Sequence, residues 1–286
     1  MNSPTLLERI TADIDDAVVS TESLSGGCVG QVYLVRLESG DRIVAKIDTG
    51  PEPCLDIEAR MLRYLADHSD LPVPQVRVDE PELLVMEYIE HDGRSGADVA
   101  IEAADALASL HDVGADSYGF EYDTLIGGLR LPNPQSQDWP AFFAEHRLVD
   151  MAHRAADADM LDTEIVGRVE TLAADIDDYL DAPTGPSLIH GDIWGGNVLS
   201  HAGHLQALID PAIYYADPEI ELAFISLFNT FGARFYERYA EHRPIDDGFF
   251  EVRRDLYNLF PLLVHVRLFG GTYVDDVETT LEKFGV

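Results

Sequence analysis

Lysine is nearly absent from this chain. Only Lys46 and Lys283 are lysines among 19 basic residues, against 53 aspartates and glutamates, and the formal net charge is −34. Such an acidic surface repels nucleic acid and anionic membranes, so we expect neither as a partner. Because screening over about 3 Å at 1 M salt would remove the self-repulsion, we hypothesise a halophilic, archaeal host. A protein that keeps its fold and activity at low salt would count against that hypothesis.

Cysteines and long apolar runs are also scarce. Two cysteines, Cys28 and Cys54, make no disulfide framework and fit a reducing cytosol; a Cys28–Cys54 bridge or a redox-sensitive Cys28 is the alternative. The chain contains no run of about 18 apolar residues, so we expect no membrane span. Residues 1–5 lack the features of a secretory signal. We therefore expect a cytoplasmic protein. Its 286 residues and 46% hydrophobic content predict two packed domains.

The most informative stretch runs from Leu188 to Ala212. It contains Asp192, Asn197 five residues later and Asp210 thirteen residues after that, between short apolar runs typical of strands. Kinases use one Asp to accept the proton of the attacking hydroxyl, an Asn to bind Mg²⁺, and a second Asp to bridge Mg²⁺ to the phosphates. This pattern predicts Asp192 as the catalytic base, with Asn197 and Asp210 as metal ligands. The alternative is a strand–turn–strand in which these residues only form turns.

A glycine-rich segment lies near the N-terminus, just before an apolar strand-like run. Glycines allow tight turns and bring backbone N–H groups close to phosphates. The spacing Gly-Gly-x-x-Gly is less specific than Gly-x-Gly-x-x-Gly, and an ordinary hairpin turn is the alternative. The residues predicted to bind ATP here are Gly26, Gly27, Cys28 and Gly30.

Lys46 lies near the end of an apolar run at residues 42–47. This arrangement matches the kinase strand whose Lys holds the α- and β-phosphates. The chain has only two lysines, and one of them lies here. This indicates that the position needs a compact ammonium group rather than a guanidinium group. Glu58, near the start of a helix predicted at 54–66, is the expected ion-pair partner that orients Lys46. The alternatives are Asp56 or Glu52 as the partner, or a purely surface role for Glu58.

The remaining pattern predicts strands followed by helices. Polar, glycine-containing residues 91–96 predict a hinge, before which the backbone of Glu87, Tyr88 and Ile89 is expected to bond the adenine edge. The order predicts an α+β, bilobal, protein-kinase-like fold: an antiparallel-sheet N-lobe at 1–90 that binds nucleotide, and a mostly helical C-lobe at 91–286. The expected segments are helices at 4–20, 98–111, 139–156, 162–180, 219–241, 248–266 and 275–284, strands at 76–78 and 83–89, and an irregular region at 114–134.

Along nearly its whole length the chain resembles the fructosamine kinase, or ketosamine-3-kinase, family, within the aminoglycoside-phosphotransferase-like kinases. The most specific match is the run from His190 to Asn197, followed by Asp210-Pro211-Ala212 and the double Tyr at 214–215. The further matches are Ser25-Gly26-Gly27-Cys28, Ala108-Ser109-Leu110-His111, Tyr118-Gly119-Phe120, Asp138-Trp139, Glu221-Leu222-Ala223 and Phe269-Gly270-Gly271-Thr272-Tyr273.

The resemblance implies a function. The family uses ATP and Mg²⁺ to phosphorylate the 3-hydroxyl of ketosamines, small molecules or glycated proteins; the unstable 3-phosphate then releases the amine, which is deglycation. By position it implies Asp192 as base, Asn197 and Asp210 as metal ligands and Lys46 as phosphate clamp, while Trp194 is expected either to stack on the sugar or to pack.

Two departures from the family and two other functions stay open. Leu131 replaces an expected Gln and Asn229-Thr230 two expected glycines, which leaves the sugar unassigned. The rival functions are a kinase of the same fold acting on an aminoglycoside, choline or homoserine, and a nucleotide-binding pseudokinase. The sequence does not predict an oligomeric state.

Overall fold

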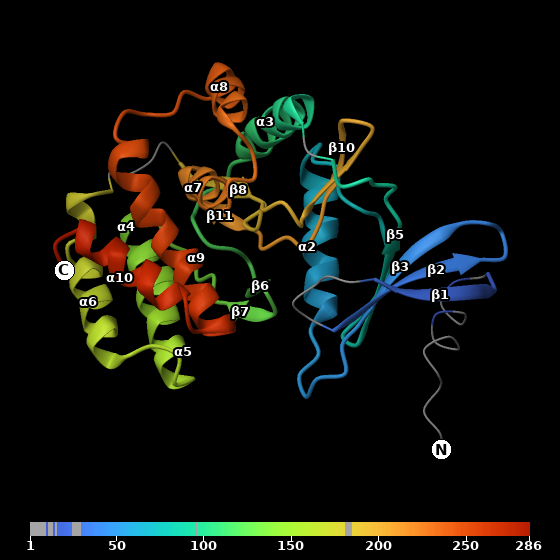
Figure 1. Ribbon diagram of the computed structural model, residues 1–286, viewed down its shortest axis with the longest axis horizontal. Coiled ribbons are helices and arrows are strands. Elements are labelled where there is room, and N and C mark those ends of the chain that lie inside the picture. Colours follow the sequence, from blue (N-terminus) through green and yellow to red (C-terminus); the bar gives the residue numbers. More distant parts are fainter. Residues whose placement is uncertain (1–9, 11–13, 15, 25–29, 95, 181–184) are drawn as a thin grey trace.

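The chain folds into two lobes, joined in the middle of the view in Figure 1. The structure is a computed structural model, and it describes residues 10, 14, 16–24, 30–94, 96–180 and 185–286. A sheet and one helix form the N-terminal lobe, and nearly all remaining helices form the other lobe. The predicted α+β, bilobal kinase-like fold is therefore confirmed.

Five antiparallel strands make up the N-terminal sheet, in the order β1-β2-β3-β5-β4. Lys46 on the central β3 is directly opposite Val32 of β2 on one side and Leu84 of β5 on the other. The register is therefore fixed from both sides where Lys46 must be held. The strands are β1 (Val18–Leu24), β2 (Gln31–Leu37), β3 (Arg42–Ile47), β4 (Val76–Glu80) and β5 (Leu83–Glu87).

The helix predicted at residues 4–20 is wrong at its end. Residues 18–20 belong to β1, which pairs with β2 from Val18↔Leu37 to Leu24↔Val32. The segment begins with Val18-Val19-Ser20-Thr21, and β-branched residues fit a paired strand better than a helix. Most of residues 4–17 and all of Gly26, Gly27 and Cys28 lie outside the described residues.

Helix α2 (Leu55–His68) connects the two lobes and carries Glu58. On one face Leu55, Ala59 and Leu62 pack with Leu84 and Met86 of β5. On another face Ile57, Met61 and Leu65 join the large core of the C-terminal lobe. Because 3.6 residues make one turn, Glu58 falls between these two apolar faces and points along the junction of the lobes.

The C-terminal lobe contains three small antiparallel strand pairs. β8 (Ser187–Ile189) pairs with β11 (Tyr214–Ala216), β9 (Val198–His201) with β10 (His204–Leu208), and β6 (Thr124–Ile126) with β7 (Leu129–Leu131). The last pair is a hairpin inside the region predicted to be irregular. Its turn contains Gly127 and Gly128, which both adopt positive φ (53° and 82°).

The helices match the predictions except between 219 and 241. Instead of one helix there are two, because Asn229 adopts a left-handed φ of 47° and Gly232 caps the second helix. The helices of this lobe are α3 (Ala97–His111), α4 (Trp139–Phe143), the π-helical η1 (Ala144–Val149), α5 (Asp150–Asp157), α6 (Thr163–Ala174), the 3₁₀ turn η2 (Ile176–Asp178), α7 (Glu219–Leu227), α8 (Ala233–His242), the π-helical η3 (Phe249–Arg253), α9 (Arg254–Phe269) and α10 (Tyr273–Lys283).

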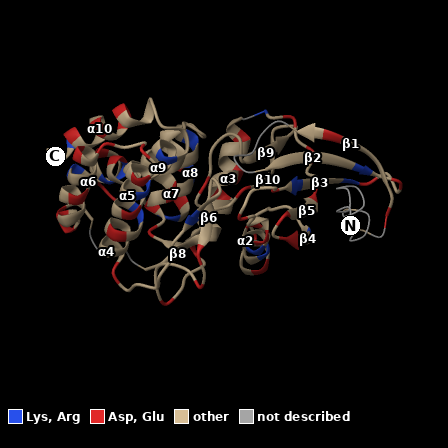
Figure 2. Cartoon of the chain, turned by 90° about the horizontal axis from the view of Figure 1, so that it is seen from below, with Lys and Arg blue, Asp and Glu red and all other residues tan. Residues whose placement is uncertain are grey.

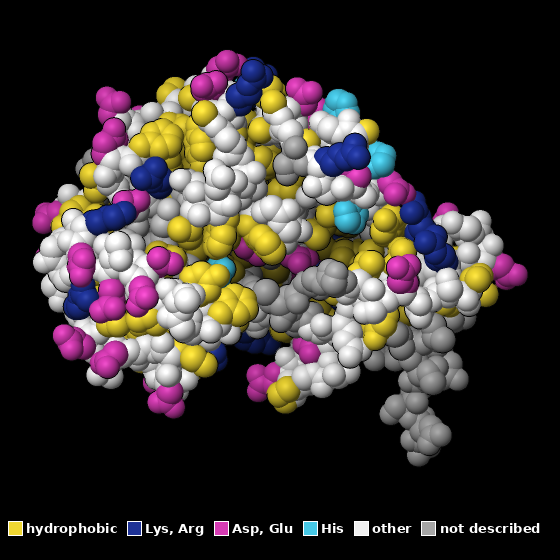
Figure 3. Space-filling view, in the orientation of Figure 1, with side chains coloured by type: hydrophobic (Ala, Val, Ile, Leu, Met, Phe, Trp, Pro, Cys, Tyr) yellow, Lys and Arg dark blue, Asp and Glu magenta, His cyan; other side chains and the backbone are white. Residues whose placement is uncertain are grey.

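Acidic residues, red on the ribbon in Figure 2, lie along both lobes, and they outnumber basic residues 53 to 19 in the sequence. Figure 3 shows hydrophobic side chains gathered in the middle of one face, beside acidic side chains in a hollow. Among the described residues, none of the helices is both long and apolar enough to span a membrane.

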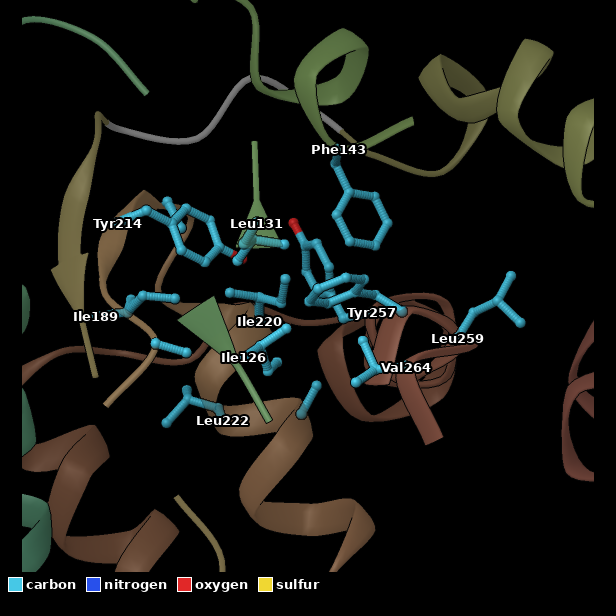
Figure 4. Close-up of a cluster of buried hydrophobic side chains, with 14 of the residues drawn as sticks. Ile126, Leu131, Phe143, Ile189, Tyr214, Ile220, Leu222, Tyr257, Leu259 and Val264 are labelled. Atoms are coloured by element: carbon cyan, nitrogen blue, oxygen red, sulfur yellow. The ribbon is translucent and has the colours of Figure 1, made fainter. Parts of the chain in front are cut away.

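A single large hydrophobic core fills the C-terminal lobe (Figure 4). Leu131, which replaces the expected family Gln, is completely buried in it, as are Phe143 and Ile189. The substitution at 131 therefore concerns packing of this lobe rather than a surface that a substrate would touch. The same core encloses β8 and β11, the strands that hold the segment of residues 190–212.

Candidate active site

The loop between β8 and β9 places Asp192 and Asn197 against each other. Asn197 donates from Nδ2 to the backbone oxygen of Asp192 (2.8 Å) and to its Oδ2 (3.0 Å). Gly191 has φ 85°, and a Cβ there would lie 2.2 Å from the carbonyl oxygen of Ala212. Only glycine allows the loop to pass so close to the next segment, so the backbone itself fixes where Asp192 emerges.

Lys46 is buried at the junction of the lobes between two carboxylates. Its Nζ donates to Oε1 of Glu58 (2.6 Å) and also to Oδ1 of Asp210. Burial alone would lower the pKa of Lys46, but Glu58 and Asp210 outweigh it and hold the pKa above its ordinary value. The ammonium therefore stays charged, and the competing partners Asp56 and Glu52 make no such ion pair.

Asp210 adopts an unusual backbone conformation for a residue with a side chain. Its φ is 55°, in the left-handed region. Strain of this kind typically costs about 1–3 kcal/mol and is found where function requires a particular geometry. Here it directs the carboxylate towards Lys46, across the junction of the lobes.

The electrostatic environment of Asp192 differs from that of a surface carboxylate. Burial, followed by repulsion from Asp210, raises the pKa of Asp192 to about 7, while the hydrogen bond from Asn197 acts in the opposite direction. A carboxylate with a pKa near neutrality can accept a proton effectively, as a general base must.

A buried network behind the loop was missed by the sequence analysis. Glu221 of α7 accepts the backbone N–H of Gly191 at Oε1 (2.6 Å) and Nε2 of His111 at Oε2 (2.9 Å). His111 in turn contacts Tyr239 Oη through Nδ1 (2.6 Å), so both of its ring nitrogens have a partner. Burial would raise the pKa of Glu221, but His111 lowers it overall. The family match Glu221-Leu222-Ala223 did not indicate this role of Glu221.

Trp194 lies on the exposed side of the catalytic loop. Its side chain is 44% exposed. A Cβ at residue 196 would lie 2.4 Å from the six-membered ring, so the indole lies across Gly196. The ring is held by packing on one side and remains accessible on the other, so the two expected roles are compatible.

The other predicted nucleotide contacts occupy the edge of the N-terminal lobe. Gly30 has φ 73° and passes so close to β3 that a Cβ would lie 2.1 Å from the carbonyl oxygen of Ile47. The backbone N–H of Glu87 already donates to Gln75 O (2.9 Å). Tyr88 and Ile89, the other residues expected to bond the adenine edge, follow β5 just before the predicted hinge at 91–96. Gly26, Gly27 and Cys28 lie outside the described residues.

The donor set suits Mg²⁺. This ion prefers oxygen ligands and is usually held by one or two protein groups together with substrate phosphates. Asn197 uses its amide nitrogen for Asp192, which directs Oδ1 away from that contact, and Asp210 uses only Oδ1 for Lys46. One oxygen of each residue is thus available. In the described part of the chain, no cluster of three or more His, Cys, Asp or Glu side chains offers an alternative metal site.

Cys54 is a free, buried thiol at the N-cap of α2. Burial, together with neighbouring acidic groups, raises its pKa, which makes the reactive thiolate form less accessible. Its predicted alternative partner, Cys28, lies outside the described residues.

Known proteins similar to this chain in sequence include kinases of one family. The sequence profile of the fructosamine kinase family matches residues 5–285. A protein of Synechocystis named "probable ketoamine kinase" is 32% identical over 99% of this chain and 98% of its own length. The chloroplastic protein-ribulosamine 3-kinase of indica rice is 28% identical, over 93% of this chain and 79% of its own.

Solved structures agree. A candidate fructosamine-3-kinase from Thermobifida fusca superposes with a TM-score of 0.87 at 31% identity, covering 98% of each chain. An ADP-bound aminoglycoside phosphotransferase has a TM-score of 0.67 at 16% identity, covering 96% of this chain and 95% of its own, and shares the fold.

Proposed function

Because the chain belongs to the fructosamine kinase family, we propose that it transfers the γ-phosphoryl group of ATP to the 3-hydroxyl of ketosamines. The substrates are fructosamine or ribulosamine adducts, as small molecules or on protein lysines. The unstable 3-phosphate then releases the amine, so the reaction is a step of deglycation. The lobe of residues 1–90 binds the nucleotide, and residues 91–286 provide the catalytic loop and the acceptor site.

On the donor side, Lys46 and the N-terminal lobe hold the nucleotide. The ammonium of Lys46 fixes the α- and β-phosphates, and Glu58 keeps it in position through their 2.6 Å ion pair. Backbone groups of Tyr88 and Ile89 contact the adenine, and the glycine-rich segment that ends at Gly30 binds the phosphates. Since the net charge of −34 repels ATP, this local positive site must offset the repulsion.

Asn197 and Asp210 would hold Mg²⁺, which supplies charge neutralisation for the β- and γ-phosphates when bound. Within the protein, Asn197 also orients Asp192 by its amide N–H (3.0 Å). Asn197 would thus bind Mg²⁺ through its amide oxygen and orient Asp192 through its amide nitrogen.

On the acceptor side, Asp192 receives the substrate. The 3-hydroxyl donates a hydrogen bond to its carboxylate, which accepts the proton as the phosphoryl group is transferred. Positioning and charge stabilisation provide most of the rate enhancement. Trp194 offers an exposed ring beside Asp192 on which the apolar face of a sugar can stack.

The observation that carries the proposal is the union of Lys46, Glu58 and Asp210 beside Asp192, in a chain matched by the family along its length. The test measures ATP consumption at molar KCl with Mg²⁺ and a ribulosamine or fructosamine of lysine, with Asp192→Ala as the blank. Turnover that disappears in the blank supports the proposal. ATP binding without turnover by the wild type would instead favour a different alcohol substrate or a sensor.

We also propose a cytoplasmic location and adaptation to high salt. The support is the excess of 53 acidic over 19 basic residues. Activity and folding should both increase between about 0.1 M and several molar KCl, as the Debye length falls from about 10 Å. Equal activity at both ends of this range, measured in the same assay, would contradict the salt adaptation.

A further inference from the structure

A row of aromatic rings lies where the α7–α8 connection meets the end of α9 and the start of α10. The ring centroids of Phe228 and His265 lie 5.1 Å apart, those of His265 and Phe269 5.5 Å, and those of His265 and Tyr273 4.9 Å. We call these four side chains the ring wall. They come from the α7–α8 connection, the end of α9 and the start of α10, which the fold brings together.

Part of the ring wall is open to solvent. Phe269 is 57% exposed, among the largest values for an apolar side chain in the described residues. Next to it, the sulfur of Met160, itself 42% exposed, would lie 3.1 Å from a Cβ at residue 270. Large exposed apolar groups that gather in one place commonly mark a binding surface.

The chain segment that carries Phe228 makes a direct contact with the loop between β8 and β9. Thr230 donates from Oγ1 to the backbone oxygen of Ile193 (3.2 Å), the residue after Asp192. Phe228 precedes Thr230 by two residues, in the segment where Asn229 takes a left-handed φ of 47°. This is also where the chain has Asn229-Thr230 in place of two expected glycines, so the wall includes a feature particular to this chain.

The chemistry of the reaction determines what must lie here. In a ketosamine the amine nitrogen is four bonds from the reacting 3-oxygen, hence within about 5 Å of it. The phosphoryl donor approaches Asp192 from the side of Lys46 and Asp210, and in-line transfer requires the acceptor to enter from the other side. The amine and its substituent are therefore expected on the side of the C-terminal lobe, where Thr230 of the α7–α8 connection contacts the loop.

The charge of the region fits that occupant. A ketosamine amine is a secondary ammonium at neutral pH, and aromatic faces attract cations. Asp275 and Asp276, in the first turn of α10, are exposed next to Tyr273. Carboxylates near the rings make the local potential favourable for a cation.

We propose that the ring wall, and Phe269 in particular, binds the ammonium group of the ketosamine and the first carbon atoms of its amine substituent. The wall thereby selects the amine, whereas the sugar contacts the catalytic loop. This proposal rests on the proposed function and adds to it the class of amine preferred: apolar or aromatic substituents carried on a cationic nitrogen.

The test compares two ketosamines that share the sugar and differ in the amine, one made from benzylamine and one from methylamine. Phe269→Ala should raise KM for the benzylamine adduct about tenfold, as expected for a lost ring–cation contact with its apolar neighbours. KM for the methylamine adduct should rise less, and KM for ATP should not change. Phe269→Leu, which keeps apolar volume without a ring, should fall between wild type and Phe269→Ala.

The matched control is Phe250→Ala. Phe250 is 43% exposed but lies in η3, where its ring contacts Tyr236 and Phe249. This variant should retain wild-type KM for both ketosamines.

The experiment distinguishes failure of amine binding by the ring wall from failure of the proposed kinase function. If the wild type phosphorylates ketosamines but Phe269→Ala keeps the wild-type KM, or Phe250→Ala changes it equally, the ring wall does not bind the amine. If the wild type phosphorylates neither ketosamine, the proposed function itself is overturned, and this proposal with it.

Discussion

Glu58 and Glu221 are both paired with basic side chains inside the fold, and they differ in what else surrounds them. Glu58 pairs with Lys46 at the junction of the lobes, where its side chain is 12% exposed and Asp210 beside it is 28% exposed. Glu221 pairs with His111 behind the catalytic loop, where both side chains are completely buried. The first pair faces a space that a ligand can enter, and the second does not.

The hydrogen bonds show the same difference. Glu221 uses both oxygens within the protein, one for Gly191 and the other for His111. Lys46 is instead held between two carboxylates from different lobes, and its three N–H donors can be redistributed when phosphates arrive. A buried ion pair can thus serve either to fix a backbone or to keep a charge ready for a ligand, and solvent access distinguishes the two.

The largest effect among these variants is expected for Glu221→Gln. The variant keeps the size of the side chain but replaces one acceptor by a donor that faces the N–H of Gly191 or His111. We expect a loss of about 1–3 kcal/mol in the free energy of unfolding and at least a tenfold decrease in kcat, because Asp192 follows Gly191. Urea denaturation and ATP consumption measure the two effects.

Glu219→Gln is the control for that experiment. Glu219 lies in the same helix and pairs with Arg253, away from the catalytic loop. It should lose stability while retaining kcat; an equal loss of kcat in both variants would contradict a specific role of Glu221.

At the other pair, Lys46→Arg keeps the charge and changes its shape. A guanidinium is a planar fork that cannot occupy the compact site between Glu58 and Asp210. We expect KM for ATP to rise about tenfold, equivalent to about 1.4 kcal/mol, with a smaller change in KM for the ketosamine. Lys283→Arg, at the only other lysine, should have no effect.

Asp217 differs from Glu58 and Glu221, because among the described residues no basic side chain contacts this buried carboxylate. It accepts Tyr257 Oη (2.6 Å) and the backbone N–H of Glu219 (3.0 Å). Burial, with repulsion from Glu219, raises the pKa of Asp217 to about 6. The folded state therefore binds this proton more tightly than the unfolded state, so its contribution to stability decreases as pH rises through 6.

Between pH 5 and pH 7 the wild type should lose about 1 kcal/mol of unfolding free energy through Asp217. Asp217→Asn, which cannot ionise, should lack this component. The measurement is the difference between wild type and variant in urea unfolding at the two pH values. A difference that is constant with pH would show that Asp217 does not titrate in this range.

The smallest effect is expected at Asn229→Gly. Glycine adopts the left-handed φ of 47° without strain but gains entropy when unfolded, so stability should change by less than about 1 kcal/mol. Ala202→Gly, at another left-handed residue (φ 51°) in the turn between β9 and β10, is the matched control. Only Asn229→Gly should alter the preference between ketosamines, because only Asn229 adjoins the ring wall.

How far the sequence predicted the structure depends on whether an interaction has a local signal. The strand with Lys46, the helix with Glu58 and the loop from Asp192 to Asn197 each have a characteristic pattern of apolar and polar residues, and their elements were predicted correctly. The Lys46–Glu58 contact was predictable because kinase-like spacing restricts the possible partners to a few residues.

The missed features depend on contacts that spacing does not encode. Glu221 meets Gly191 from thirty residues away, and the family match at Glu221-Leu222-Ala223 marks the position without indicating this contact. The break after α7 follows from a single left-handed residue, Asn229, within an otherwise helical pattern. The end of the N-terminal helix was wrong since β1 is stabilised by pairing with β2, a tertiary effect that outweighs helical periodicity.

The scarcity of lysine has a consequence for the life of the protein in a sugar-containing environment. Reducing sugars attack exposed side-chain amines, and this chain has only two lysines. Lys46 is 6% exposed and bound by two carboxylates, and Lys283 is 53% exposed but paired with Asp255. An enzyme proposed to reverse damage to lysines thus offers almost no lysine to be damaged. It can remain active in conditions under which its proposed protein substrates accumulate adducts, without first having to repair copies of itself.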